Sequence, residues 1–469
     1  MNNFSKIGFI LATLGSSIGL GHIWRFPYMA GENGGSAFVI FYLILSICIG
    51  VPMLLAEMLL GNKARSNPMD NYVVLHTLNS LPLNTAQNEH NYINKDSNKS
   101  LMWLGINAIA GPIILSFYAV VLGWIIYYLI FVSFHLPNNL NQAKAIFDEI
   151  RAHSLLYQTL CFGIIIALTA FIVARGIKRG IERLNLILMP LLFLIFIGLL
   201  LYAMTLPEFE KAWHFMFNFQ PHNMSAKTIL DSLGQVFFSL SLGVGTIAVY
   251  AASAQQNENL FKSALWVVIS GIIVSIIAGL MIFTFIYHFQ GQPSQGPGLL
   301  LVSLPLAFQT LGESGKIISM LFFIAILFAG ITSTISMLEP GVSILRDKFT
   351  FSQAKASYLL SFGVFILGFL VILWANDEIS LPSIFGKRLF DTLEFITSSF
   401  LMPLGMLITL VFLGWGIKKA YLRHWTGYLN NTLFEIWHKI ICIIAPSVIL
   451  IILLSQYIDI IGFINSIFV

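Results

Sequence analysis

The chain has very little charge for its length. Only 10% of its 469 residues are Asp, Glu, Lys or Arg, whereas an ordinary soluble domain has about 25%. Hydrophobic residues make up 57% of the chain, and the mean hydropathy is +0.84. No soluble core could absorb so much apolar surface. The sequence therefore excludes a soluble globular protein and predicts an all-α polytopic membrane protein.

Cysteine is also scarce, and basic charge is only slightly in excess. Cys48, Cys161 and Cys442 all lie in apolar segments, which argues against a disulfide framework or a zinc site. The net charge of +4 is too modest to indicate a nucleic-acid partner. No small-residue cleavage pattern follows Lys6, so we expect no cleavable signal peptide. No enzymatic activity is expected.

Eleven apolar segments are long enough to cross a bilayer, which takes about 20 residues each. They are 6–30, 36–61, 101–134, 155–174, 181–204, 226–254, 260–289, 315–345, 355–374, 391–416 and 437–458. Lys and Arg are concentrated in alternate connecting segments. This bias predicts a multi-pass protein of the cell inner (plasma) membrane, with a cytoplasmic amino terminus and an extracytoplasmic carboxyl terminus.

Two short tracts share one glycine rhythm, and each interrupts an apolar segment. Residues 17–21 read SIGLG and residues 241–245 read SLGVG. Each glycine weakens a helix by about 1 kcal/mol relative to alanine, although small residues can also serve close helix packing. Matched interruptions in two halves favour a 5+5 inverted-repeat transporter with its site between the breaks. We expect repeats at 1–204 and 226–416 and an additional span at 437–458.

One arginine lies inside the first apolar segment. Arg25 would cost about 2.5–3.5 kcal/mol at the bilayer centre. We expect it to face a water-filled path or an acidic partner, with Asp391 and Glu394 as candidates near the outer end of the tenth segment. The alternative is that its side chain extends to the membrane interface.

A hydroxyl-rich run lies in the middle of the eighth segment. Ala329, Thr332 and Ser333 fall on one helix face, so that a carbonyl and two hydroxyls can hold a hard cation. Alternatively, the hydroxyls bond to their own preceding turn. A broken helix adds free carbonyls for a cation and free N–H groups for a carboxylate. Together these features favour an amino acid that is carried with a metal ion.

Several motifs resemble signatures of the neurotransmitter:sodium symporter family, which includes bacterial leucine and hydrophobic amino-acid transporters. They are GSSIGLGHIWRFP at 15–27, ENGG at 32–35, GIKRGIE at 176–182, GQVFFSLSLG at 234–243 and FAGITS at 328–333. The motifs occur in the expected order along almost the whole chain. The resemblance implies a broken first and sixth helix and transport by alternating access.

The resemblance also implies ligand sets at matching positions. The second sodium site would use Gly15, Ile18, Ala329, Thr332 and Ser333, and the first would use Ser17, His22 and Ser239. Chloride would be held by Tyr42, Gln235, Ser239 and Ser275. The substrate site would be formed by Ser17, Leu20, Gly21, Ile114, Tyr118, Phe238, Ser239, Ser241, Val244, Ser333 and Met337. The gates would comprise Arg25, Asp391, Glu394, Tyr118, Phe238 and Asp347.

The sequence departs from the family pattern at several of these positions. His22 and Gly271 stand where the family has two asparagines of the first sodium site. Gly19 stands where monoamine carriers have an aspartate, which favours an amino acid over a monoamine. At the inner gate, the usual tyrosine is Ser253 and the usual arginine has no counterpart, although Lys6 could replace it.

These observations predict a sodium-coupled symporter that imports a neutral, hydrophobic or aromatic amino acid. Two alternatives stay open. A proton-coupled or mixed-ion carrier could use His22, which titrates near physiological pH, although this histidine could simply be hydrogen-bonded between helices. A non-transporting amino-acid receptor could retain the same pocket. The expected partners are a small amino acid, sodium and the lipid bilayer.

Overall fold

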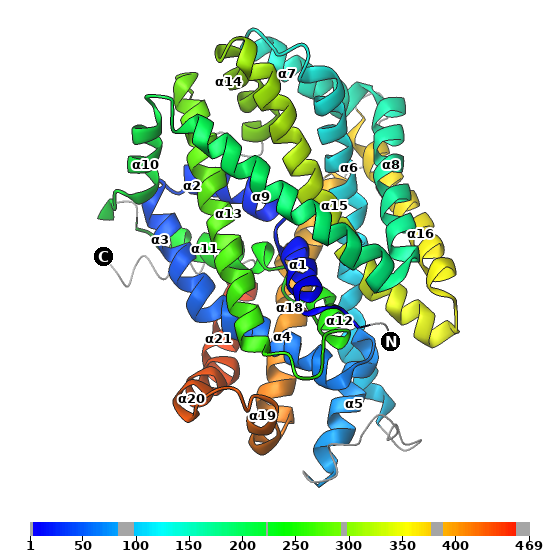
Figure 1. Cartoon of the computed structure of the whole chain (residues 1–469). Coiled ribbons are helices and arrows are strands. Elements are labelled where there is room, and N and C mark those ends of the chain that lie inside the picture. Colours follow the sequence, from blue (N-terminus) through cyan, green and yellow to red (C-terminus); the bar gives the residue numbers. More distant parts are fainter. Residues whose placement is uncertain (1–2, 83–97, 222–223, 292–297, 377–387, 456–469) are drawn as a thin grey trace.

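The computed structural model describes residues 3–82, 98–221, 224–291, 298–376 and 388–455, and these contain helices but no strands (Figure 1). Nine of the described helices are long and apolar enough to cross a membrane. A tenth span is a pair of helices bent by 50° at residues 18–20. An eleventh is interrupted between residues 239 and 246. The helices thus correspond to the eleven predicted segments, and residues 456–458 of the last segment lie outside the described residues.

The first half of the chain contains five spans and three additional helical segments. Spans 1 to 3 are α1 (Lys6–Ser17) with η1 (Gly21–Arg25) and α2 (Phe26–Glu32); α3 (Ser36–Leu45) with η2 (Ser46–Gly50) and α4 (Val51–Ala64); and η3 (Lys99–Ile109) with α6 (Ala110–Tyr127) and η4 (Tyr128–Val132). Spans 4 and 5 are α8 (Leu155–Ala174), and η6 (Ile177–Glu182) with α9 (Arg183–Ala203). The additional segments are α5 (Pro68–Ser80), α7 (Leu140–Asp148) with η5 (Glu149–His153), and α10 (Phe209–Phe217).

The second half contains six spans. Spans 6 to 8 are α11 (Ala226–Ser239) with α12 (Thr246–Ala252), α13 (Leu260–His288) and α15 (Glu313–Phe349). Spans 9 and 10 are α16 (Gln353–Ala375), and α17 (Leu389–Glu394) with η9 (Phe395–Leu401), α18 (Met402–Val411) and η10 (Phe412–Gly416). Span 11 is α20 (Asn431–Lys439) with η11 (Ile440–Ile444) and α21 (Ala445–Ser455). The shorter helices are η8 (Leu299–Ser303) with α14 (Leu304–Thr310), and α19 (Lys419–Trp425).

The two interrupted spans lie in the middle of the bundle. In Figure 1, α1 and α12 are surrounded by the other spans, whereas α7 and α14 lie at one end of the molecule and α5, α19 and α20 at the other. α1 packs against α9, α13 and α15, and α12 packs against α4 and α15. Large apolar side chains such as Leu160, Leu194 and Phe362 are exposed on the outer spans, as expected for a lipid-facing surface. The spans therefore place both breaks where protein surrounds them.

Candidate functional site

The first span breaks at Ile18–Leu20. Ile18 adopts an extended conformation (φ −79°, ψ 90°) directly after α1, and the helix resumes as η1 at Gly21. The free backbone N–H of Leu20 donates to the phenol oxygen of Tyr118 over 3.2 Å. The α6 tyrosine therefore stabilises the start of the second half-helix, where a carboxylate would also be favoured.

The sixth span breaks more sharply, because three residues between its half-helices have left-handed backbone conformations. They are Ser241 (φ 52°), Gly243 (φ 78°) and Gly245 (φ 80°). Position 243 is also crowded, since a methyl group there would lie 2.1 Å from the carbonyl oxygen of Met402. The glycines that predicted this break are thus required by its geometry.

Two residues from neighbouring spans hold this break, and the sequence analysis missed both. The Glu57 carboxylate accepts a hydrogen bond from the backbone N–H of Gly243 over 3.0 Å. The Asn107 side-chain amide donates to the carbonyl of Gly243 over 2.5 Å. Glu57 is buried in α4, and a lone carboxylate inside an apolar span is a functional signal by itself. That signal could have identified Glu57.

Hydrogen bonds join the two breaks directly. The Ser241 hydroxyl donates to the carbonyl of Ser16 over 3.1 Å. The Gln235 amide donates to the carbonyl of Gly21 over 2.8 Å. The interrupted helices therefore face each other, as the matched glycine tracts predict.

A cavity lies between the breaks, and most of the predicted substrate residues line it. Those at the cavity are Ser17, Leu20, Gly21, Ile114, Tyr118, Phe238, Ser241, Val244, Ser333 and Met337. Ser239 does not line it, because its buried hydroxyl donates to the carbonyl of Val236. The structure adds four lining residues that sequence reasoning missed, Ser16, Thr246, Ser336 and Met402, and Gly19 lines the cavity as well.

Oxygen atoms from spans 1 and 8 meet at the position of the second sodium site. The Ser333 hydroxyl lies 3.2 Å from the carbonyl oxygens of both Gly15 and Ala329. The Thr332 hydroxyl lies 2.9 Å from the Ala329 carbonyl oxygen. Ile18 is buried where α1 ends. This donor set of carbonyl and hydroxyl oxygens suits a hard cation.

Asn185 was not predicted at this place. Its buried Oδ1 has no hydrogen-bond partner among the described residues. It lies so close to Gly15 that a methyl group on that glycine would be 2.0 Å away. α9 therefore brings an unpaired oxygen beside the cation group, and any side chain at position 15 would disturb both.

The predicted first sodium site stays a prediction, and two of its three residues are hydrogen-bonded within their own helices. The Ser17 hydroxyl donates to the carbonyl of Thr13 over 3.1 Å, and the Ser239 hydroxyl donates to Val236 within its own helix. His22, the third residue of this predicted site, lies on η1 and is buried. Both hydroxyls thus bond to the preceding turn of their own helix, and so do the Thr332 and Ser333 hydroxyls, as the alternative for the eighth segment predicts.

The residues predicted for chloride are all buried, and Tyr42 interacts with both Ser275 and Ser239. The hydroxyls of Tyr42 and Ser275 lie 3.4 Å apart. Gln235 uses its amide nitrogen on Gly21 and leaves Oε1 unpaired. Since Ser239 bonds within α11, chloride binding here stays a prediction.

Arg25 contacts Phe238, one of the residues that line the cavity. Its guanidinium lies 4.6 Å from the ring centroid of Phe238, and it donates to the Gly234 carbonyl over 3.3 Å. Glu394 lines the same neighbouring cavity as Arg25 and Tyr118. The pairing of Arg25 with Asp391 or Glu394 stays a prediction.

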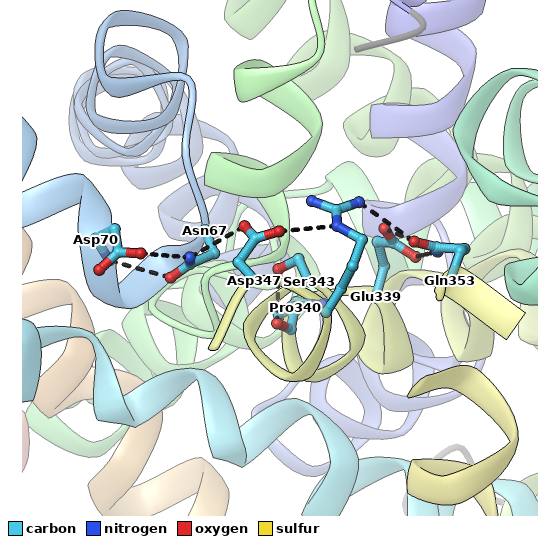
Figure 2. Close-up of polar contacts among 8 residues, drawn as sticks. Asn67, Asp70, Glu339, Pro340, Ser343, Asp347 and Gln353 are labelled. Atoms are coloured by element: carbon cyan, nitrogen blue, oxygen red, sulfur yellow. Dashed lines mark hydrogen bonds and ion pairs between the residues drawn. The ribbon is translucent and has the colours of Figure 1, made fainter. Parts of the chain in front are cut away.

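A row of polar residues, called the inner row because it lies on the side predicted to be cytoplasmic, connects α5 to α15 and α16. Asn67, the residue that caps α5, donates to the carboxylates of Asp70 over 2.7 Å and of Asp347 over 3.1 Å. Figure 2 shows these three side chains in one row with Glu339 and Gln353, whose amide donates to the Glu339 carboxylate over 3.0 Å. Asp347, the predicted acidic gate residue, is therefore part of this inner row.

The cation of the inner row comes from α15 itself. Arg346 donates to Asp347 over 2.8 Å and to Gln353 over 3.3 Å. Lys6, the expected substitute, is exposed and is not the partner of Asp347. Instead, the N-terminal segment docks through Phe4, which is buried against Tyr250 and donates its N–H to the Ser253 carbonyl.

We expect Asp347→Ala to open the inner face more often, because it removes the acceptor shared by Asn67 and Arg346. Half-exposed ion pairs contribute about 0.2–1 kcal/mol, so we expect the inner face to be open about two- to fivefold more often. The reporter is a cysteine at buried Ser253, which lines a cavity of about 200 Å³ beside Glu339. Its labelling rate by a maleimide from the inner side is measured in a Cys48→Ala background.

Glu435→Ala serves as the control, because it breaks an exposed ion pair with Lys419 at the α19–α20 turn, away from the inner row. It should leave the labelling rate unchanged. Equal labelling in the parent and in Asp347→Ala would contradict a latch at Asp347.

Comparison with known proteins identifies relatives along the whole chain. The model of the sodium:neurotransmitter symporter family matches residues 2–80 and 139–463. The uncharacterised sodium-dependent transporter YhdH of Bacillus subtilis is 34% identical over 96% of both chains. An uncharacterised sodium-dependent transporter of Haemophilus influenzae is 30% identical, over 96% of this chain and 97% of its own.

A solved structure shares the fold. The crystal structure of MhsT in complex with L-phenylalanine superposes with a TM-score of 0.83 at 32% identity, covering 97% of this chain and 100% of that one. This likeness confirms the predicted all-α membrane fold.

Proposed function

Because the chain belongs to the sodium:neurotransmitter symporter family, we propose that this sodium-dependent symporter imports a neutral amino acid with a large apolar side chain. It is a multi-pass membrane protein and uses sodium, as its relatives do. The observation that carries the proposal is the cavity between the two helix breaks, which joins a polar end made of backbone groups to an apolar end.

The polar end suits a zwitterion. The N–H groups that begin the half-helix at Leu20 and Gly21, with the Tyr118 hydroxyl, favour a carboxylate. The carbonyls that end α1 and α11 favour an ammonium group, because the helix dipole is negative there. A ligand with both charges a few bonds apart would satisfy both half-helices.

The apolar end suits a hydrophobic side chain. Ile114, Val244, Met337 and Phe238 provide its apolar lining. MhsT binds L-phenylalanine, which supports an apolar and aromatic amino acid as the substrate of this chain. Gly19 supports an amino acid over a monoamine. A methyl group there would lie 2.5 Å from the Ser333 hydroxyl, so an aspartate would not fit without displacement.

Ser333 links ion and substrate. Its hydroxyl belongs to the oxygen group of spans 1 and 8, and the same residue lines the cavity. A sodium ion at this group would hold Gly15 against α15 and so fix the inner half of span 1 while the substrate is bound. Entry of one sodium charge at about 100 mV supplies about 2.3 kcal/mol, enough for roughly fiftyfold accumulation.

Uptake in proteoliposomes tests the proposal. An inward sodium gradient at clamped internal and external pH should drive accumulation of labelled phenylalanine or leucine, and equal uptake in potassium would refute sodium coupling. Uptake driven by a proton gradient alone would support the proton-coupled alternative through His22. Binding without counterflow of labelled amino acid would identify the receptor alternative.

Replacing chloride by gluconate in the same uptake assay tests the predicted chloride group at Tyr42 and Ser275. The proposed orientation, with the amino terminus in the cytoplasm, follows the distribution of Lys and Arg.

Gly19→Ala is expected to reduce substrate affinity by at least about tenfold, since its methyl group would displace Ser333 and Tyr118, which lies 2.8 Å away. Competition binding with phenylalanine measures the effect. The matched control is Gly198→Ala in α9, where an added methyl group meets nothing within 4 Å. Equal affinity in Gly19→Ala and the parent would place the substrate elsewhere.

A further inference from the structure

His22 fills a closed space between η1 and α13. Its side chain is fully buried, and the residue opposite it on α13 is Gly271. A methyl group on Gly271 would lie 2.5 Å from Nε2 of His22 and 3.3 Å from Cδ2 and Cε1. Protein interiors do not accommodate such contacts without displacement. Histidine at position 22 and glycine at position 271 are therefore a matched pair, and any larger residue at 271 excludes the imidazole.

The imidazole is held by shape rather than by hydrogen bonds. Neither ring nitrogen has hydrogen-bond geometry to a partner among the described residues, and the backbone of Ser17 is the polar group that interacts with the ring. The sequence analysis offered a histidine that is hydrogen-bonded between helices as an alternative. Among the described residues, the His22 nitrogens form no such bond. A buried ring whose nitrogens form no well-aligned hydrogen bond serves mainly to occupy volume.

The imidazole of His22 fills the space beside Gly271, and an imidazole is a poor ligand for a hard cation. Carboxylate, carbonyl, hydroxyl and water oxygens suit such cations, whereas imidazole suits transition metals. The Ser17 and Ser239 hydroxyls donate to carbonyls of their own helices, as the Thr332 and Ser333 hydroxyls do, so the difference between the two positions is the imidazole. An amide at position 271 cannot be added while the imidazole stays. The contrast with the oxygen group around Ser333 is direct, because there two hydroxyls and two carbonyls meet within about 3 Å.

We propose that His22 and Gly271 together close the first sodium position, so that the chain binds a single sodium ion, at Thr332 and Ser333. The inference rests on the proposed sodium coupling and deepens it by fixing the number of ions. With a single ion, the limiting accumulation of substrate rises in direct proportion to the sodium gradient. With two ions it would rise with the square of that gradient.

Equilibrium binding of ²²Na⁺ to the purified full-length protein tests the stoichiometry, with choline chloride replacing sodium chloride as the blank. We expect a single ion per chain and its loss in the Thr332→Val, Ser333→Ala double variant. Two ions per chain in the parent would overturn the inference while leaving sodium coupling intact. Absence of any bound sodium would overturn the coupling as well, so the two failures are distinguishable.

A paired substitution tests the role of the imidazole. His22→Asn combined with Gly271→Asn replaces the ring and its socket by two amide oxygens, and we expect a second bound ion and a Hill coefficient for sodium that rises above one. Gly271→Asn alone should lower the melting temperature, because the new side chain collides with the retained imidazole. If the paired variant is folded, judged by its size-exclusion profile, and still binds a single ion, His22 is not what closes the site and the inference is wrong.

Discussion

Removing both hydroxyls of the cation group, by Thr332→Val and Ser333→Ala together, is expected to raise the sodium concentration for half-maximal uptake by at least about tenfold. A tenfold change corresponds to about 1.4 kcal/mol, which is a typical contribution of one or two oxygen contacts to a charged group. Gly15 would lose the hydroxyl that lies 3.2 Å from its carbonyl. The measurement is a sodium titration of amino-acid uptake into proteoliposomes at constant ionic strength.

The same hydroxyl run provides a matched control. Thr334 follows Ser333 directly, but its hydroxyl lies 2.8 Å from that of Thr169 on α8, away from span 1. Thr334→Val therefore removes an equally buried hydroxyl from the same helix without touching the cation group. An equal rise in the sodium requirement for Thr334→Val would attribute the effect to the packing of α15, whereas no rise in the double variant would contradict a sodium ion at this position.

The sequence allowed the breaks to be predicted, because their cause is local. Glycines 243 and 245 have positive φ angles, which only glycine adopts readily, and the same rhythm at 19 and 21 accompanies the 50° bend in span 1. The shared face of Thr332 and Ser333 was also predictable, since helical spacing alone brings residues three or four apart together. Both inferences needed no knowledge of neighbouring spans.

The contacts that depend on distant parts of the chain were not predictable in the same way. Position 22 could be compared with the family. The close packing of His22 on Gly271, where an added methyl group would lie 2.5 Å from Nε2, depends on how η1 packs on α13. Likewise, the partner of Asp347 is Arg346, its own neighbour, together with Asn67 from α5. The sequence analysis looked for the partner of Asp347 in the N-terminal segment and therefore found neither Arg346 nor Asn67. Tertiary packing decides that Phe4, and not Lys6, anchors this segment.

Glu57→Leu is expected to abolish transport. The Glu57 carboxylate accepts from the Gly243 N–H, in a stretch whose left-handed residues cannot form helical hydrogen bonds. An unpaired buried N–H costs about 1–3 kcal/mol, and α4 touches the backbone of α12 so closely that a methyl group on Gly61 would be 1.8 Å from the Ala248 carbonyl oxygen. The sixth span would then rearrange, and with it the Ser241 contact to span 1. Uptake normalised to the amount of protein in the membrane measures the loss.

Glu57→Gln separates the hydrogen bond from the charge. Glutamine keeps an oxygen that can accept from Gly243, so we expect substantial uptake to remain and the melting temperature to fall less than in Glu57→Leu. Glu435→Leu, at an exposed position on α20, should resemble the parent in both measurements. Because the substrate cavity lies between the two breaks, the order of uptake should follow the ability of residue 57 to hold the break in the sixth span. Full uptake by Glu57→Leu would mean that Asn107, which bonds the Gly243 carbonyl, holds the break without the carboxylate.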